Sequence, residues 1–116
     1  MKLGDVIGLG AGAAGLMAGI EARTAGYTRL NFTVAINYGG RDEVLRAVRA
    51  IAAEVAAGRL APEALTETVL SDHLDTCGIP DPDLVIRTSG ETRTSNFLPW
   101  QTAYAEYEFT PTLWPD

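Results

Sequence analysis

Short apolar runs alternate with segments of helical spacing along this chain of 116 residues, and the alternation limits the folds open to it. Consecutive strands joined by a helical crossover lie parallel, and such crossovers are right-handed. The pattern therefore predicts an α/β fold, with an open, mainly parallel sheet and flanking helices. We expect strands at residues 5–8, 30–36 and 84–86, a short extended piece at 107–109, and helices at 11–25, 42–57, 63–74 and 97–104.

Two of these helices carry end signals. Asp42 is a residue type that caps helix N-termini, and Gly58 is a typical stop. Pro62 stands in the first turn of the next helix, where proline is tolerated. The Gly-Ile-Pro-Asp-Pro stretch at residues 78–82 then predicts a loop before the strand at 84–86. The apolar residues that follow helical spacing after Asp42 are Val44, Leu45, Val48, Ile51, Ala52 and Val55.

Composition and charge restrict the class of protein. Hydrophobic residues make up 47% of the chain and the net charge is −6, so we expect one globular domain over residues 1–116 that does not bind nucleic acid. The single cysteine, Cys77, cannot form an internal disulfide and suits a reducing compartment. The apolar stretch at residues 6–20 is interrupted by Glu21 and Arg23 before it is long enough to span a membrane. We therefore expect a cytoplasmic protein without a transmembrane segment.

A cationic loop follows the apolar run at residues 84–86. The run ends at Arg87, and Arg93 and Ser95 follow shortly after it. In open α/β sheets, ligands bind beyond the carboxyl ends of the strands. Two guanidinium groups and a hydroxyl suit a bidentate oxyanion. The sequence therefore predicts a ligand that carries a diphosphate.

Three blocks of sequence are similar to those of one known family. Residues 37–43 read Asn-Tyr-Gly-Gly-Arg-Asp-Glu, and residues 82–91 read Pro-Asp-Leu-Val-Ile-Arg-Thr-Ser-Gly-Glu, followed by Arg93, Ser95, Asn96 and Phe97. The third block runs from Trp100-Gln101 through Ala-Tyr-Ala-Glu at 103–106 to Leu-Trp-Pro-Asp at 113–116. Over residues 24–116 the chain resembles the carboxyl-terminal half of a cis-prenyltransferase, one of the isoprenyl transferases that include undecaprenyl diphosphate synthase.

The resemblance implies a partial cis-prenyltransferase fold, a homodimer and a reaction. Isopentenyl diphosphate would be condensed in cis geometry with an allylic diphosphate, such as farnesyl diphosphate, under Mg²⁺, to give a polyprenyl diphosphate. Arg87, Arg93 and Ser95 would bind the diphosphate of isopentenyl diphosphate, and Glu106 would help to ligate Mg²⁺.

Three further residues of these blocks are assigned supporting roles. Glu91 and Asn96 would orient the arginines by hydrogen bonding. Arg41 would either contact substrate or pair with Asp42 or Glu43. Gly39 and Gly40 would permit a tight turn beside the site.

The sequence departs from the family in its first part. Family members are longer, and their amino-terminal half carries an Asp-Gly-Asn-Gly-Arg type of loop that binds the allylic diphosphate and Mg²⁺. This sequence contains no such loop, so no catalytic residue is assigned. We therefore expect a truncated chain that keeps the isopentenyl diphosphate half of the site and has no appreciable turnover alone.

Two other interpretations stay open. Residues 1–23 form a divergent Gly- and Ala-rich segment, in which Gly10, Gly12 and Gly15 match the GxGxxG pattern of dinucleotide-binding folds, although Asn37 stands where an acidic residue is expected. The chain could also be an inactive partner that pairs with a full-length synthase. Two cations without evident partners favour the enzyme-derived interpretation, because unpaired cations have no purely structural use.

Overall fold

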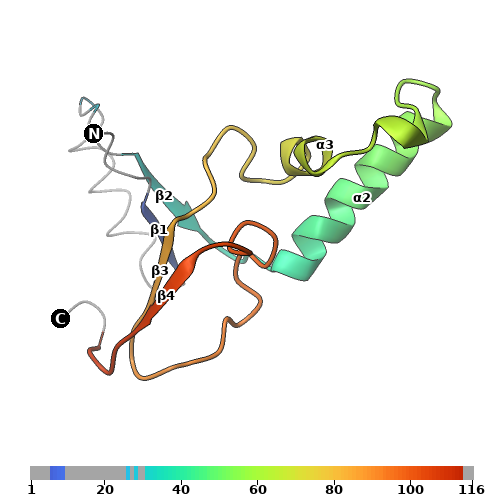
Figure 1. The fold of residues 1–116 in the computed structure, drawn as a ribbon. Helices are drawn as coiled ribbons and strands as arrows, with labels where there is room; N and C mark the ends of the chain where they lie inside the picture. The colour runs from blue at the N-terminus through green and yellow to red at the C-terminus, as the bar shows by residue number, and fades with distance from the viewer. Residues whose placement is uncertain (1–5, 10–25, 27, 29–30, 114–116) are drawn as a thin grey trace. The chain divides into compact units, whose positions relative to one another are not determined.

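The structure is a computed structural model that describes residues 6–9, 26, 28 and 31–113. The chain divides into two compact units, residues 1–38 and 39–116, each described by itself. In the first unit, β1 (Val6–Leu9) and β2 (Phe32–Ala35) pair in parallel, with Val6 opposite Phe32 (Figure 1). Both predicted strands and their parallel pairing are confirmed. Asp5 and the helix predicted at residues 11–25 lie outside the described residues.

Helix α2 (Gly40–Ala56) opens the second unit. The predicted helix and its end before Gly58 are confirmed, and Gly58 has a φ of 69°, which glycine adopts without strain. The prediction that Asp42 caps the helix is wrong, because Gly39 occupies the N-cap position. Asp42 lies instead in the first turn, where its carboxylate pairs with Arg46 at 3.0 Å, one turn later.

The buried face of α2 differs from the predicted apolar stripe. Gly40, Glu43, Ala47 and Ile51 are buried, at the spacing of one helix face. Within the predicted stripe, Ile51 is buried, whereas Leu45 and Val48 remain about half exposed. The buried face is therefore rotated toward Glu43, and it carries a carboxylate that needs hydrogen-bond donors in the interior.

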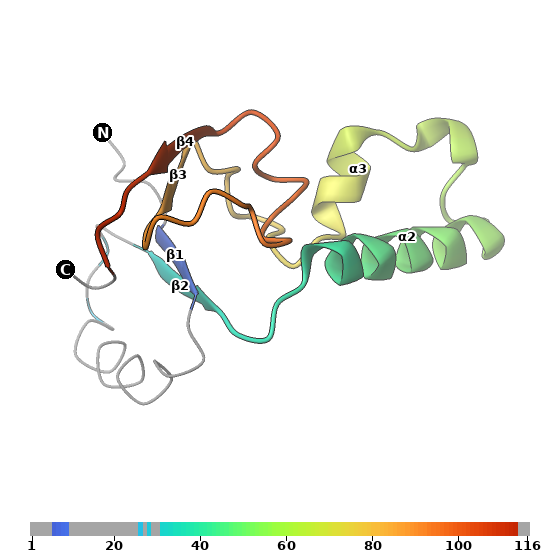
Figure 2. The same ribbon diagram turned by 90° about the horizontal axis from the view of Figure 1, so that it is seen from below.

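The helix predicted at residues 63–74 is divided in two. The structure has a 3-10 turn, η1 (Pro62–Ala64), followed by the short helix α3 (Glu67–Asp72). Between them Thr66 is extended, and its Oγ1 accepts a hydrogen bond from the amide of Val69 at 3.3 Å. Because an N-cap residue has non-helical dihedral angles, a cap at Thr66 starts a new helix and cannot lie within a longer one. Helices α2 and α3 lie side by side (Figures 1 and 2).

Strands β3 (Leu84–Arg87) and β4 (Glu106–Phe109) form a second parallel pair, with Leu84 opposite Glu106. The predicted strand and extended piece are thus confirmed, and every described strand pair is parallel, as an α/β fold requires. The prediction of a helix at residues 97–104 is wrong, since these residues form bends and turns. Leu98 has a φ of 46°, in the left-handed region, so a regular helix cannot run through it.

The described core of the second unit lies where α2 meets the segments around residues 74–76 and 98–102. Its buried apolar side chains are Ala47, Ile51, Leu74 and Leu98, and its buried polar ones are Glu43, Gln101 and Thr102. Full burial of a leucine or isoleucine contributes about 1.5–3 kcal/mol. A few such side chains are thus combined with a polar network centred on Glu43.

Candidate functional site

Arg87 and Ser95 lie in contact at the carboxyl end of β3. Arg87 is the last residue of the strand, and its Nη2 donates a hydrogen bond to Ser95 Oγ at 3.0 Å. The Nε of Arg87 is buried and has no hydrogen-bond partner among the described atoms. A buried donor without an acceptor is costly, at roughly 1–3 kcal/mol. The tertiary structure therefore brings together two of the three predicted diphosphate ligands and leaves a donor of one of them unused.

The loop from β3 to Gln101 holds several residues in an uncommon backbone conformation. Ser89, Ser95, Asn96 and Leu98 all have positive φ, between 46° and 63°. Left-handed conformations of residues other than glycine cost of order 1–3 kcal/mol each and persist only where the surroundings enforce them. Such residues gather at ligand sites, so the loop has the backbone character of a functional segment.

Arg93 is exposed and paired. Its Nη2 lies 3.0 Å from Glu91 Oε2, and its side chain is 73% exposed. The expectation that Glu91 orients an arginine is thus matched by a contact. Arg93 is not, however, the unpaired cation that the sequence suggests. Because an exposed ion pair is worth about 1 kcal/mol or less, a diphosphate could replace Glu91 as its partner.

Asn96 bonds the start of α2 and not an arginine side chain. Its Oδ1 accepts a hydrogen bond from the amide of Arg41 at 3.0 Å, and its carbonyl oxygen accepts one from the amide of Gly40 at 2.9 Å. Figure 2 shows the loop after β3 running to this end of α2. The side chain of Arg41 is exposed and forms no ion pair with a described residue, since Asp42 pairs with Arg46 and Glu43 is buried.

Gly39 and Gly40 were predicted to permit a tight turn, but neither takes the left-handed conformation for which glycine is usually needed. Neither has positive φ, and Gly39 is extended with a φ of −138°. Gly40 is needed for a different reason, because a Cβ there would lie 2.1 Å from Pro99 Cδ. Its role is a close approach between α2 and the loop.

Glu106 lies apart from Arg87. It begins β4 opposite Leu84, whereas Arg87 is opposite Phe109, three residues or about 10 Å further along the strands. The alternation of the strands also places Arg87 on the face of Val85 and Tyr107, and Glu106 on the other. Glu106 is exposed. The described residues contain no group of three or more acidic, histidine or cysteine side chains that could hold a metal ion.

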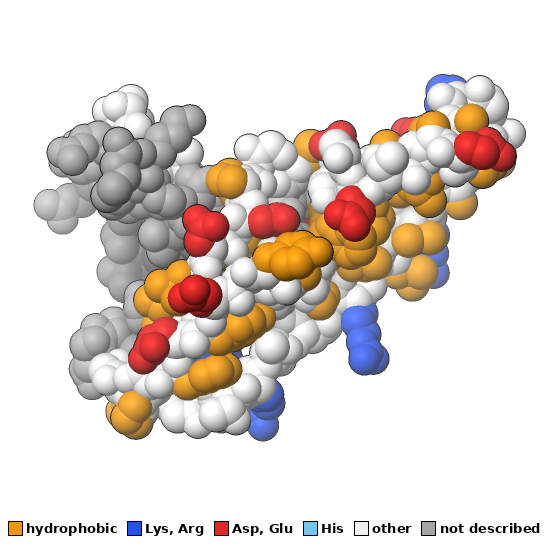
Figure 3. Space-filling model, in the orientation of Figure 1, with side chains coloured by type: hydrophobic (Ala, Val, Ile, Leu, Met, Phe, Trp, Pro, Cys, Tyr) orange, Lys and Arg blue, Asp and Glu red, His pale blue; other side chains and the backbone are white. Residues whose placement is uncertain are grey.

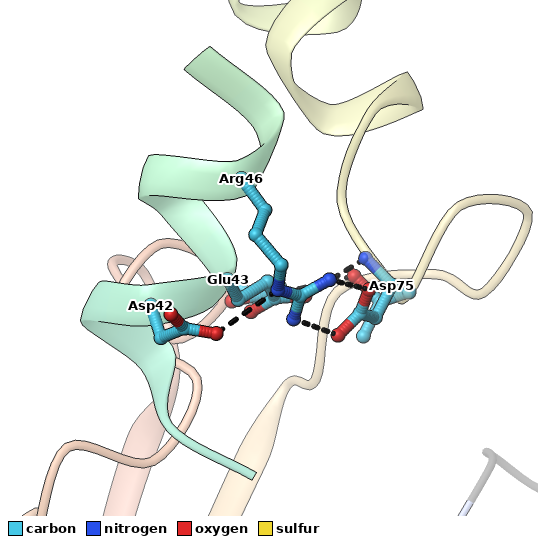
Figure 4. A network of polar contacts seen from close by, with 6 residues as sticks. Asp42, Glu43, Arg46 and Asp75 are labelled. Atoms are coloured by element: carbon cyan, nitrogen blue, oxygen red, sulfur yellow. Dashed lines mark hydrogen bonds and ion pairs between the residues drawn. The ribbon is translucent and has the colours of Figure 1, made fainter. Parts of the chain in front are cut away.

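A polar network beside the loop has no counterpart in the sequence predictions (Figure 4). Buried Glu43 accepts a hydrogen bond from the amide of Asp75 at 2.9 Å, and both its carboxylate oxygens lie 3.2 Å from Gln101 Nε2. Arg46 binds both oxygens of Asp75, at 2.8 and 2.7 Å, and this guanidinium lowers the pKa of Asp75 below its ordinary value. The one sequence signal for the burial of Glu43 was its position four residues before Ala47, which places both residues on the same helix face.

Two other surface features do not suit a diphosphate. The groove between α2 and α3 is lined by apolar groups from residues that include Val48, Leu70 and Trp100. Figure 3 shows acidic side chains scattered over the described part of one face, without a broad basic patch. The predicted oxyanion ligands Arg87 and Arg93 are not among the residues that line this groove. None of the described helices is long and apolar enough to cross a membrane.

Comparison with known proteins gives consistent results. The family model Prenyltransf, described as undecaprenyl diphosphate synthase, matches residues 2–116. The chain is 53% identical over 114 residues to an isoprenyl transferase of Agrobacterium fabrum. It is 54% identical over 100 residues to a (2E,6E)-farnesyl-diphosphate specific ditrans,polycis-undecaprenyl-diphosphate synthase of Xanthomonas campestris pv. campestris. The match includes the Gly- and Ala-rich segment, so it is longer than the predicted range of 24–116.

The structure is similar to a solved enzyme structure as well. It matches the crystal structure of lavandulyl diphosphate synthase from Lavandula x intermedia in complex with dimethylallyl diphosphate, with a TM-score of 0.74 and 34% identity. This match covers 97% of the chain and 51% of that enzyme. The sequence matches cover 98% and 86% of the chain but 46% and 39% of the two relatives, so the chain spans less than half of their length. From the family match over residues 2–116 and from these likenesses, we conclude that the chain belongs to the undecaprenyl diphosphate synthase family of isoprenyl transferases.

Proposed function

We propose that this chain provides the part of an isoprenyl transferase site that binds isopentenyl diphosphate. In the proposed reaction, isopentenyl diphosphate is condensed with an allylic diphosphate in cis geometry to extend a polyprenyl diphosphate. The observation that carries the proposal is the contact of Arg87 with Ser95 at the carboxyl end of β3, where Arg87 Nη2 donates to Ser95 Oγ at 3.0 Å. An oxyanion at this loop would meet a guanidinium and a hydroxyl that are already held together.

The residues of the loop would share the work of holding the diphosphate. Arg87, fixed at the end of β3, would present its planar fork of donors to phosphate oxygens. Ser95 would add a neutral donor. Arg93 would exchange Glu91 for a phosphate oxygen, because its present ion pair is exposed. Together they would neutralise and orient the diphosphate, so that the hydrocarbon end takes a defined direction.

Mg²⁺ does not fit the described residues by themselves. Glu106 offers one carboxylate, and no cluster of metal-binding side chains accompanies it in the described part of the chain. Mg²⁺ often takes one or two protein carboxylates and completes its shell with phosphate oxygens and water. Glu106 as a ligand stays a prediction, and the roles given above to Arg87, Arg93 and Ser95 do not depend on the metal.

Calorimetric titration with isopentenyl diphosphate tests the proposal. We expect saturable binding by the wild-type chain and a loss of about 10- to 100-fold in affinity for Arg93→Ala, since a hydrogen bond to a charged group contributes about 1.5–3 kcal/mol. Arg49→Ala is the matched control, because Arg49 is an exposed arginine of α2 that forms no described ion pair. It removes the same charge from elsewhere on the surface.

The outcomes separate the candidate functions. Equal weakening by Arg93→Ala and Arg49→Ala would mean attraction by overall charge and would count against a site at the loop. A folded wild-type chain that binds no isopentenyl diphosphate would contradict the proposal and favour an inactive partner of a full-length synthase. Sedimentation of the chain alone would test the predicted homodimer. A flavin or nicotinamide spectrum would favour the dinucleotide interpretation, whose residues Gly10, Gly12 and Gly15 lie outside the described part.

A further inference from the structure

The start of α2 is capped by a residue far away in the sequence. The first amide groups of a helix have no partners within it, and an N-cap side chain usually binds one of them. Gly39 has no side chain to do so. The amides of Gly40 and Arg41 instead donate to the carbonyl oxygen and to Oδ1 of Asn96, at 2.9 and 3.0 Å. One residue of the loop thus satisfies two amides of the helix.

The contact is close enough to require glycine at one position and not at its neighbour. A Cβ at Gly40 would lie 2.1 Å from Pro99 Cδ and 2.7 Å from the carbonyl oxygen of Asn96. A Cβ at Gly39 would come no nearer than 3.6 Å to any atom, an ordinary contact. The extended backbone of Gly39 also accepts any residue. The two glycines therefore form a matched pair for an experiment.

The loop needs such an anchor. Ser95 and Asn96 are consecutive left-handed residues, with φ of 52° and 62°. Asparagine tolerates the left-handed conformation better than most residues, whereas serine tolerates it less well. Since Ser95 Oγ receives the hydrogen bond of Arg87, the backbone at Asn96 determines where these two groups meet.

We propose that Asn96 is a positioning residue: by capping α2 with its side chain and carbonyl group, it holds Ser95 and Arg87 in the arrangement that receives the diphosphate. The inference rests on the proposed function, because it concerns binding at the same loop. Asn96 acts through Ser95 and Arg87 and does not itself need to touch the ligand.

Amide hydrogen exchange tests the anchor in the absence of ligand. In Asn96→Ala, the amide of Arg41 loses its acceptor, and we expect it to exchange at least about tenfold faster than in the wild type. Asn96→Asp keeps an oxygen at Oδ1, so protection should be retained. Asn96→Asp is assessed by amide exchange alone, because its negative charge would repel a diphosphate. An Arg41 amide that stays protected in Asn96→Ala would overturn the proposal.

Affinity for isopentenyl diphosphate tests the consequence. We expect Asn96→Ala and Gly40→Ala each to weaken binding about five- to tenfold, while Gly39→Ala binds like the wild type. Thr66→Ala, which removes the side-chain cap of α3, controls for a general loss of stability. It should lower the melting temperature without weakening the binding.

Failure of this inference can be told apart from failure of the proposed function. If the wild type binds and both Asn96→Ala and Gly40→Ala bind equally well, the positioning role is overturned and the site at the loop remains. If the wild type does not bind, the proposed function and the positioning role both fall, while the exchange data still show whether Asn96 caps α2. Equal weakening by Thr66→Ala would also overturn the positioning role, because stability alone would then explain the effect.

Discussion

Replacing Glu43 with alanine removes the acceptor around which the polar network beside the loop is built. Glu43 is 1% exposed, and it accepts from the Asp75 amide at 2.9 Å and from Gln101 Nε2 at 3.2 Å. Gln101 Nε2 keeps Thr76 Oγ1 as an acceptor at 2.9 Å, so the Asp75 amide is the donor left without one, at a cost of about 1–3 kcal/mol, and the lost methylene adds about 0.8 kcal/mol. We therefore expect the free energy of unfolding to fall by about 2–4 kcal/mol, a large part of the roughly 5–15 kcal/mol typical of a domain.

Because this loss could unfold the chain, Glu43→Gln is the milder variant. It keeps the shape of the side chain and one acceptor oxygen, but its NH₂ group is a second donor beside the Nε2 donor of Gln101. We expect the free energy of unfolding to fall by about 1–2 kcal/mol. Gln101→Ala and the double variant complete a cycle. We expect a coupling energy of about 1.5–3 kcal/mol, as for a hydrogen bond to a charged group.

Urea unfolding followed by circular dichroism measures these differences. Glu63→Ala, at an exposed position of η1, is the control for removing a carboxylate from the surface. The reasoning would be refuted if Glu43→Ala cost less than about 0.5 kcal/mol with an unchanged m value, since that is the range of exposed positions.

Three further predictions concern local contacts. Thr66→Ala should lower the free energy of unfolding by about 1 kcal/mol through loss of the α3 cap, and Thr68→Ala, exposed on the same helix, should not. Hydrogen bonds to the Val69 carbonyl and to Glu54 raise the pKa of His73. The charged ring therefore stabilises the fold below about pH 6.5, and this contribution is lost as pH rises through the folded-state pKa. Urea unfolding across this pH range should show a smaller pH dependence of stability in Glu54→Gln than in the wild type. Arg46 lowers the pKa of Asp75. The ionised carboxylate of Asp75 therefore stabilises the fold above about pH 3.8, and this contribution is lost as pH falls through the folded-state pKa. Acid unfolding of Arg46→Met should show a smaller loss of stability over this pH range than the wild type.

Features that depend on neighbouring residues could be predicted from the sequence. Helix α2 and its end at Gly58 follow from residue spacing and from glycine's conformational freedom. The strand that ends at Arg87 follows from a short apolar run between a proline-rich loop and a polar loop. The same local pattern predicted Arg87, Arg93 and Ser95 as oxyanion ligands, and the structure brings Arg87 and Ser95 into contact.

The errors arose where a distant segment competes with local preference. Asp42 is a good cap by type, but the helix begins earlier, because Asn96 bonds the amides of Gly40 and Arg41 from the loop. Glu43 would be expected on a solvated face, yet donors from Asp75 and Gln101 make its burial possible. No spacing rule connects residues that lie more than thirty positions apart.

By itself, then, the sequence determined the order and type of most described elements and the polar, cationic character of the loop after β3, because helix and strand periods and turn residues act over a few positions. The tertiary structure alone decided two of the partners of those residues: Ser95 for Arg87 and the start of α2 for Asn96. It also placed Glu106 away from Arg87, since the register between β3 and β4 depends on the pairing of two segments and not on either one alone.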